Sequence, residues 1–136
     1  MRILVVDDAA FIRDLLRLHL TAAGYEVILA ADAIAAGKEL LQSVPDLILC
    51  DVEMPHMDGF EFVAALRADS SIPRVPVIFL TSKHDGHQRA KELGACAYLT
   101  KPLLATDLVG TVARYVSGGQ SVRASRSTAG SSARSA

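Results

Sequence analysis

Cysteine, tryptophan and long apolar runs are scarce in this sequence, and each scarcity narrows the class of protein. The chain has two cysteines and no tryptophan. Two cysteines are too few for the disulfide framework of a small secreted protein. No apolar run is long enough to cross a bilayer, and the apolar stretch after Arg2 is interrupted at Asp7, so no secretory signal is evident. We therefore expect a cytoplasmic protein that does not enter membranes.

An excess of positive charge is also missing from most of the chain. Residues 1–116 carry eleven basic and fifteen acidic side chains, a net charge of −4, whereas residues 117–136 carry +3. A domain with net negative charge has no electrostatic attraction to nucleic acid. We expect no direct nucleic acid binding by residues 1–116.

The last twenty residues differ in composition from the rest. Residues 117–136 contain seven Ser, four Ala, three Gly and three Arg, with Val122 as the only larger aliphatic residue. Such a segment buries too little apolar surface to offset the entropy of ordering it. The sequence therefore predicts one domain over residues 1–116 and a flexible tail or linker over residues 117–136. This segment could tether an effector domain, contact an anionic partner, or have no dedicated role.

Strand-like and helix-like patterns alternate five times along the domain. Short, apolar, β-branched runs predict strands, and apolar residues at helical spacing predict helices. The predicted strands are 2–6, 25–30, 47–50, 77–80 and 96–99; the predicted helices are about 11–23, 33–43 and 59–68, a shorter one ending near Gly94, and 103–116. This strict alternation indicates the α/β class, with a doubly wound, five-stranded parallel sheet and five helices on its two faces.

Several conspicuous side chains are explained most simply by packing. Cys50 and Cys96 lie in apolar, strand-like surroundings, so we interpret them as small buried residues. A redox role for Cys50, beside Asp51, is the alternative. All four phenylalanines fit core or helix-packing positions: Phe11, Phe60, Phe62 and Phe79.

Four of the predicted strands lead into reactive polar residues: Asp7 and Asp8, then Asp51, then Thr81, then Lys101. Because the carboxyl ends of parallel strands share one edge of the sheet, we expect these side chains to converge in one crevice. Crowded carboxylates repel one another unless a cation is present, and Mg²⁺ prefers oxygen ligands with a phosphate nearby. Each Asp taken singly is more simply a cap or turn residue. Together they predict a site for a divalent cation and a phosphoryl group.

Asp51 can be more than a metal ligand. Carboxylates act as nucleophiles that accept phosphoryl groups, which gives an aspartyl phosphate. This transfer requires alignment and charge neutralisation. The ammonium of Lys101 can supply part of the neutralisation, and the hydroxyl of Thr81 can donate a hydrogen bond to a phosphoryl oxygen.

Four motifs in order resemble the receiver domain of two-component response regulators. The motifs are Val5-Val6-Asp7-Asp8, the segment from Asp51 to Gly59, Leu80-Thr81-Ser82, and Gly94-Ala95 followed by Tyr98 to Pro102. The resemblance covers residues 1–116. It implies the flavodoxin-like strand order 2-1-3-4-5 of chemotaxis regulators. It also implies a signalling phosphoacceptor that catalyses only its own phosphorylation and dephosphorylation, and is otherwise not an enzyme.

The resemblance assigns roles within the site. Asp51 is the phosphoacceptor. Asp8 and Asp51 bind Mg²⁺ directly, together with the backbone carbonyl of Glu53, and Asp7 acts mainly through water. Lys101 contacts the phosphoryl group, and its bond to the following proline is a cis peptide.

The resemblance further implies a switch and a set of partners. Thr81 moves toward the phosphoryl group, and Tyr98 follows from an outward to an inward rotamer. This switch remodels the fourth helix, fifth strand and fifth helix, at about residues 85–116. The phosphodonor is a histidine kinase or a histidine phosphotransfer protein, and the output is an unidentified partner or effector domain. A phosphorylation-dependent homodimer is one of the assemblies that the resemblance allows.

Some questions stay open at this point. Glu53 and Lys83 flank the path of a water that attacks the phosphoryl group, and they could pair to shield it, or Glu53 could orient that water. Asp51-Val52-Glu53 also fits a Mg²⁺-dependent aspartyl-phosphate phosphohydrolase, although Asp7-Asp8 and Lys101-Pro102 speak against that function. A receiver-like binding module that never uses phosphate is the third possibility.

Overall fold

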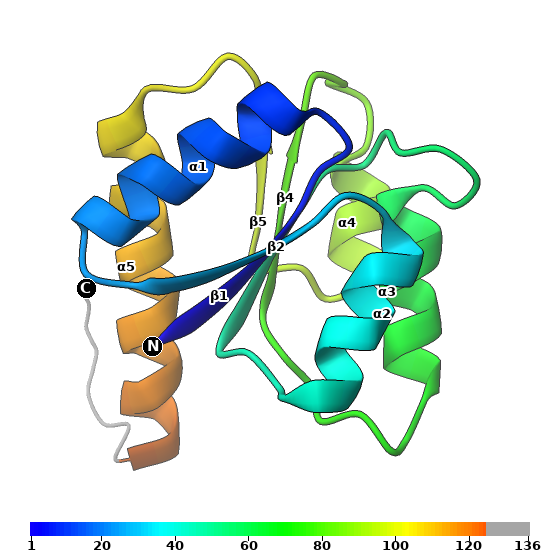
Figure 1. The fold of residues 1–136 in the computed structure, drawn as a ribbon. Helices are drawn as coiled ribbons and strands as arrows, with labels where there is room; N and C mark the ends of the chain where they lie inside the picture. The colour runs from blue at the N-terminus through cyan, green and yellow to red at the C-terminus, as the bar shows by residue number, and fades with distance from the viewer. Residues whose placement is uncertain (125–136) are drawn as a thin grey trace.

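The computed structural model describes residues 1–124 and contains five strands and five helices (Figure 1). The strands are β1 (Arg2–Val6), β2 (Glu26–Ala30), β3 (Leu47–Cys50), β4 (Val77–Thr81) and β5 (Ala97–Thr100). The helices are α1 (Ala10–Ala22), α2 (Ala33–Gln42), α3 (Gly59–Ala68), α4 (His87–Glu92) and α5 (Ala105–Ala124). Strand and helix alternate throughout, as the apolar patterns predict.

The five strands form one parallel sheet in the order β2-β1-β3-β4-β5, so the predicted fold class and strand order are confirmed. Val6 at the end of β1 pairs with Cys50 at the end of β3. The next residues, Asp7 and Asp51, therefore leave the sheet side by side at its carboxyl edge. Thr81, the last residue of β4, lies at this same edge.

Helices cover both faces of the sheet, and each face has its own core. In Figure 1, α1 and α5 lie on one side of the sheet, and α2, α3 and α4 lie on the other. Because side chains alternate along a strand, successive residues of β1 enter different cores. Ile3 and Val5 pack with the residues of α1 and α5, whereas Leu4 and Val6 pack with those of α2 and α3. The strands are therefore buried on both faces, as their continuous apolar runs require.

Local sequence signals explain several helix ends. Gly24, just after α1, has a φ of 98°, a conformation that favours glycine and ends the helix. The Asp32 carboxylate caps α2 by accepting a hydrogen bond from the Ala35 N–H at 2.8 Å. The capping box at α3, in which Asp58 and Glu61 bond reciprocally, was not predicted, although its Asp-x-x-Glu spacing is visible in the sequence.

The final helix differs from the prediction. It was expected to end at residue 116, but α5 continues to Ala124. Adding a residue to an existing helix is far less costly than starting one, so weak helix formers can extend a helix that is anchored by a packed face. Residues 125–136, the remainder of the predicted tail, lie outside the described residues. Within residues 1–124, no helix combines the length and hydropathy needed to span a membrane.

One predicted core residue lies at the surface. Phe11 is 75% exposed, whereas Phe62 and Phe79 are buried and Phe60 is partly buried. Phe11 lies in the first turn of α1, on the helix face opposite the buried Leu16 and Leu20. The packing interpretation of Phe11 is therefore wrong, and an exposed aromatic side chain lies close to the carboxyl edge of the sheet.

Candidate functional site

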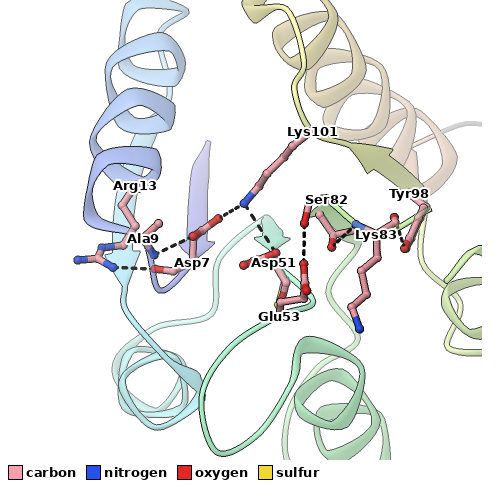
Figure 2. Close-up of polar contacts among 11 residues, drawn as sticks. Asp7, Ala9, Arg13, Asp51, Glu53, Ser82, Lys83, Tyr98 and Lys101 are labelled. Atoms are coloured by element: carbon pink, nitrogen blue, oxygen red, sulfur yellow. Dashed lines mark hydrogen bonds and ion pairs between the residues drawn. The ribbon is translucent and has the colours of Figure 1, made fainter. Parts of the chain in front are cut away.

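Three carboxylates, those of Asp7, Asp8 and Asp51, meet at the carboxyl edge of β1 and β3, and Figure 2 shows two of them, Asp7 and Asp51. Asp7 and Asp51 are only 1% and 5% exposed, whereas Asp8 is exposed to solvent. One oxygen from each of the three carboxylates can be chosen so that all lie within 4.8 Å of one another. All three are hard oxygen donors, which suits Mg²⁺ rather than a softer metal. The donor set therefore fits a single divalent cation bound at the surface of the crevice.

Lys101 brings a positive charge to this cluster from the loop after β5. Its Nζ lies 2.9 Å from Asp7 Oδ2 and 3.8 Å from Asp51 Oδ1. The backbone N–H of Lys101 donates to the Thr81 carbonyl at 2.7 Å, which fixes the start of this loop against β4. The bond between Lys101 and Pro102 is cis, as predicted. The ammonium thus partly compensates two buried carboxylates.

The Asp51 carboxyl is poorly stabilised as an anion. Burial, together with the neighbouring charges of Asp7 and Asp8, raises its pKa from 3.8 to about 6, against the opposing effects of Lys101 and a backbone hydrogen bond from Glu53. Removing a carboxylate from water and placing it beside like charges both disfavour ionisation. A cation in the crevice would therefore stabilise the ionised form of Asp51.

Both oxygens of the Asp7 carboxylate already have donors. Oδ1 accepts from the N–H of Ala9 at 2.9 Å, and Oδ2 accepts from the Lys101 ammonium. The Asp7 carbonyl accepts from Arg13 Nη1 at 2.7 Å, which ties α1 to the end of β1. Asp7 is therefore held in a fixed orientation by hydrogen bonds on every side.

The backbone after Asp51 leaves no room for a side chain at Gly59. A Cβ at this position would lie 2.2 Å from the Asp51 carbonyl oxygen, and the Gly59 N–H donates to the Val52 carbonyl at 2.7 Å. Gly59 therefore permits close packing of α3 against the loop that carries Asp51. The thiol of Cys50 is buried, and burial raises its pKa, so it behaves as a small apolar residue.

Thr81 connects to Tyr98 through one residue. The fully buried Thr81 accepts from the Lys83 N–H at 3.2 Å, and the Lys83 carbonyl accepts from the Tyr98 hydroxyl at 2.8 Å. The N–H of Gly86 donates to the same hydroxyl at 3.2 Å. The loop between β4 and α4 thus joins the two residues that sequence analysis assigns to a switch.

The Tyr98 ring lies between aromatic neighbours. The Phe60 ring stacks on it with centroids 6.4 Å apart, and the His87 ring is tilted against it at 4.3 Å. A Cβ on Gly86 would approach the Tyr98 hydroxyl to 2.5 Å and the Phe60 ring to 2.7 Å. Sequence analysis did not identify Gly86, because its role depends on side chains that meet it only in the folded protein.

Glu53 and Ser82 form a pair that sequence analysis also missed. The Ser82 hydroxyl donates to Glu53 Oε1 at 2.6 Å, and no ion pair joins Glu53 to Lys83 in the described part of the chain. Figure 2 places this pair beside Asp51. The position of Ser82 directly after Thr81 was the only signal in the sequence.

The fold and the site together define a class of protein. A doubly wound parallel sheet carries acidic residues, a hydroxyl and a lysine at its carboxyl edge, which is the arrangement of a signalling phosphoacceptor domain. Residues 3–113 match the family described as the response regulator receiver domain. The chain therefore belongs to the receiver domain family, whose members in general bind Mg²⁺ through such an acidic cluster.

Known relatives agree with this assignment. PilG of Pseudomonas aeruginosa is 32% identical over 118 residues, which are 85% of this chain and 87% of PilG. PhoB, the phosphate regulon transcriptional regulatory protein of Escherichia coli, is 35% identical over 82% of this chain, which corresponds to 49% of PhoB. The chain thus spans about half the length of several transcriptional regulators that it matches.

Solved structures show the same architecture. The chemotaxis response regulator CheY4 of Vibrio cholerae superposes with a TM-score of 0.77 at 38% identity, and the match covers 83% of this chain and 96% of CheY4. A CheY-like receiver domain protein of Methanospirillum hungatei superposes with a TM-score of 0.81 at 28% identity, covering 89% of this chain and 97% of that one. The receiver fold is therefore matched over nearly the whole length of each of these two proteins.

Proposed function

We propose that this chain is a phosphorylation-controlled signalling module in which Asp51 accepts a phosphoryl group from a histidine kinase or a histidine phosphotransfer protein. One arrangement carries this proposal. The carboxylate of Asp51 is nearly buried at the carboxyl edge of the sheet, beside two further carboxylates and 3.8 Å from the Lys101 ammonium. This is a nucleophile surrounded by the charges that a phosphoryl transfer requires.

In the proposed transfer, a carboxylate oxygen of Asp51 forms a bond to phosphorus. The bond from phosphorus to the imidazole nitrogen of the donor breaks, and its electron pair returns to the imidazole. Lys101 offsets negative charge on the phosphoryl oxygens, and the hydroxyl of Thr81 donates to one of them. These groups accelerate the reaction by positioning and electrostatic stabilisation.

The residues of the acidic cluster would hold the metal with distinct roles. Asp8 and Asp51, with the backbone carbonyl of Glu53, are the proposed direct ligands of Mg²⁺. Asp7 is proposed to act through water, which is supported by the donors that already occupy both of its oxygens. When bound, the ion supplies the positive charge that three carboxylates and an incoming phosphoryl group need.

The proposed output passes through the loop after β4. A shift of Thr81 toward the phosphoryl group would move the Lys83 peptide, which the Tyr98 hydroxyl contacts. Tyr98 lies on β5, beside α4, so this movement would alter the surface of α4, β5 and α5. We propose that an output partner binds this surface.

The phosphodonor must reach Asp51 from outside, so its docking surface must surround the crevice. An apolar groove of about 440 Å³ lies between α1 and the start of α5, and its lining includes Lys101 itself. Leu15 lines this groove and is 38% exposed. Phe11 on α1 and Leu104 just before α5 are also exposed, at 75% and 70%. We propose that an apolar helix surface of the donor protein covers these side chains.

Phosphorylation of the purified chain tests the function. With Mg²⁺ and acetyl phosphate, the intact mass should increase by one phosphoryl group, and the Asp51→Asn protein should remain unmodified. Two results would contradict the proposal: no modification of the wild-type chain, or equal modification of both proteins. Repeated turnover of p-nitrophenyl phosphate would indicate a phosphohydrolase instead, and unchanged partner binding by Asp51→Asn would indicate a module that does not use phosphate.

A further inference from the structure

A side-chain hydrogen bond joins the loops that follow β3 and β4. Ser82 Oγ donates to Glu53 Oε1 at 2.6 Å, between residues 29 positions apart in the sequence. Both side chains are exposed, so this bond is not needed to satisfy a buried polar group. Its short length is that of a hydrogen bond to an ionised carboxylate.

The position of this bond relates it to the phosphoacceptor. Glu53 is two residues after Asp51 and contributes a backbone hydrogen bond to the Asp51 carboxylate. Ser82 directly follows Thr81, the proposed hydroxyl donor to the phosphoryl group. In Figure 2 the Glu53–Ser82 pair lies beside Asp51, on the side away from Asp7. A phosphoryl group on Asp51 would therefore lie between the Lys101–Asp7 pair and the Glu53–Ser82 pair.

We propose that Ser82 is a positioning residue that restrains the Glu53 carboxylate and thereby slows hydrolysis of phosphorylated Asp51. This inference rests on the proposed function. In the hydrolysis, a water oxygen bonds to phosphorus while the bond from phosphorus to Asp51 breaks. The electron pair of that bond returns to the Asp51 carboxylate, the water loses a proton, and inorganic phosphate leaves.

The direction of the effect follows from what the bond does to Glu53. A carboxylate near the phosphoryl group can accept the proton of the attacking water and accelerate hydrolysis. The Ser82 hydroxyl occupies Oε1 and fixes the side chain along the wall of the crevice. Without this hydroxyl, the carboxylate can turn over the phosphoryl group and act as a base. Ser82 therefore holds Glu53 in the shielding arrangement.

The rate at which phosphorylated residues 1–136 lose the phosphoryl group tests this role. It is measured after removal of the donor, with Mg²⁺ present. The net free energy of one such hydrogen bond corresponds to about a fivefold change in a rate. Ser82→Ala should therefore lose its phosphoryl group about fivefold faster than wild type. Ser82→Thr keeps the hydroxyl and should decay at the wild-type rate. Ser71→Ala is the matched control, because it removes an equally short and exposed bond, from Ser71 to Asp69 at 2.6 Å, on the loop after α3.

Combining Ser82→Ala with Glu53→Gln shows whether Ser82 acts through Glu53. Its amide cannot serve as a base, so adding Ser82→Ala to it should leave the decay rate unchanged. The proposal is overturned if Ser82→Ala decays like wild type, or if it accelerates decay equally in the Glu53→Gln background. If the wild-type chain takes up no phosphoryl group on Asp51, the proposed function itself fails, and the two failures are thereby distinguished.

Discussion

Thr81 and Tyr98 are joined through the backbone of Lys83, whose N–H donates to Thr81 Oγ1 at 3.2 Å and whose carbonyl accepts from the Tyr98 hydroxyl at 2.8 Å. Thr81 is completely buried at the edge of the phosphoacceptor crevice, whereas Tyr98 is partly exposed beside α4. A displacement at Thr81 therefore has a short, hydrogen-bonded route to the surface. Phosphorylation would use this route by biasing the loop between two arrangements.

Removing the Tyr98 hydroxyl tests this connection. Tyr98→Phe deletes the donor to the Lys83 carbonyl and the acceptor of the Gly86 N–H, which we expect to lower the free energy of unfolding by about 1 kcal/mol. The Gly86 amide should exchange with solvent faster than in wild type. Adding beryllium fluoride with Mg²⁺ should change the exchange rates of this loop less in Tyr98→Phe than it does in wild type. Amide hydrogen exchange measures both effects. Unaltered protection of Gly86 would show that the hydroxyl does not order the loop.

Gly86 should tolerate no side chain while Tyr98 occupies its observed position. Gly86→Ala places a methyl group 2.5 Å from the Tyr98 hydroxyl and 2.7 Å from the Phe60 ring. We expect a loss of about 1–3 kcal/mol in the free energy of unfolding, with the Tyr98 ring displaced in a crystal structure. Gly110→Ala is the control, because open space surrounds Gly110 within α5, and it should stabilise by about 0.5–1 kcal/mol. Urea denaturation measures both changes in the free energy of unfolding, which should be negative for Gly86→Ala and positive for Gly110→Ala.

Lys101 should contribute to both stability and chemistry. Lys101→Met leaves the buried carboxylates of Asp7 and Asp51 without their neighbouring ammonium. Without divalent cations we expect a loss of about 1–3 kcal/mol in the free energy of unfolding, and phosphorylation by acetyl phosphate should slow by about 10²-fold. Lys91→Met, on the exposed surface of α4, should change neither quantity. An equally large stability loss in the Asp51→Asn background would show that charge compensation at Asp51 is not the cause.

The positions of Asp7 and Asp51 could be predicted from the sequence because the backbone alone decides them. Apolar strands that end on Asp7 and Asp51 must bring these residues together once β1 and β3 pair in parallel, because the pairing of Val6 with Cys50 leaves no other placement. The strand order itself came from the family resemblance, since the alternation of strands and helices permits several doubly wound orders.

Features that depend on side chains meeting across the fold could not be predicted in the same way. The bond between Ser82 and Glu53 depends on rotamers, and neither residue type demands a partner at the surface. The steric role of Gly86 requires knowledge of where the Tyr98 ring lies. The sequence predicts a core or helix-packing position for Phe11, but helical geometry places it on the solvent side of α1. Each of these is a consequence of tertiary packing rather than of local pattern.

The pKa of Asp51 predicts how stability depends on pH in the metal-free protein. Burial and the charges of Asp7 and Asp8 raise the folded-state pKa from 3.8 to about 6. A raised acid pKa means that the folded chain holds this proton more tightly than the unfolded chain. The contribution of Asp51 to stability is therefore full below about pH 4 and is lost as the pH rises through about 6.

Asp51→Asn removes this titration, so its stability relative to wild type should depend on pH. The two proteins should differ little at pH 4, and the variant should be more stable by about 2–3 kcal/mol at pH 7 without metal. Adding Mg²⁺ should reduce the stability difference between the two proteins at pH 7, because an ion that binds only the folded wild type stabilises it. Urea denaturation at several pH values, with and without Mg²⁺, measures these differences.

Asp69→Asn provides a control of opposite sign. Hydrogen bonds from the Ser71 side chain and backbone lower the pKa of Asp69, which is exposed and distant from the crevice. A lowered acid pKa contributes stability above the unfolded-state value, so Asp69→Asn should be less stable than wild type at pH 7 and should not respond to Mg²⁺. The stability difference between Asp51→Asn and wild type could instead stay constant from pH 4 to pH 7, or be unchanged by Mg²⁺. Either result would show that the charge of Asp51 does not destabilise the metal-free protein.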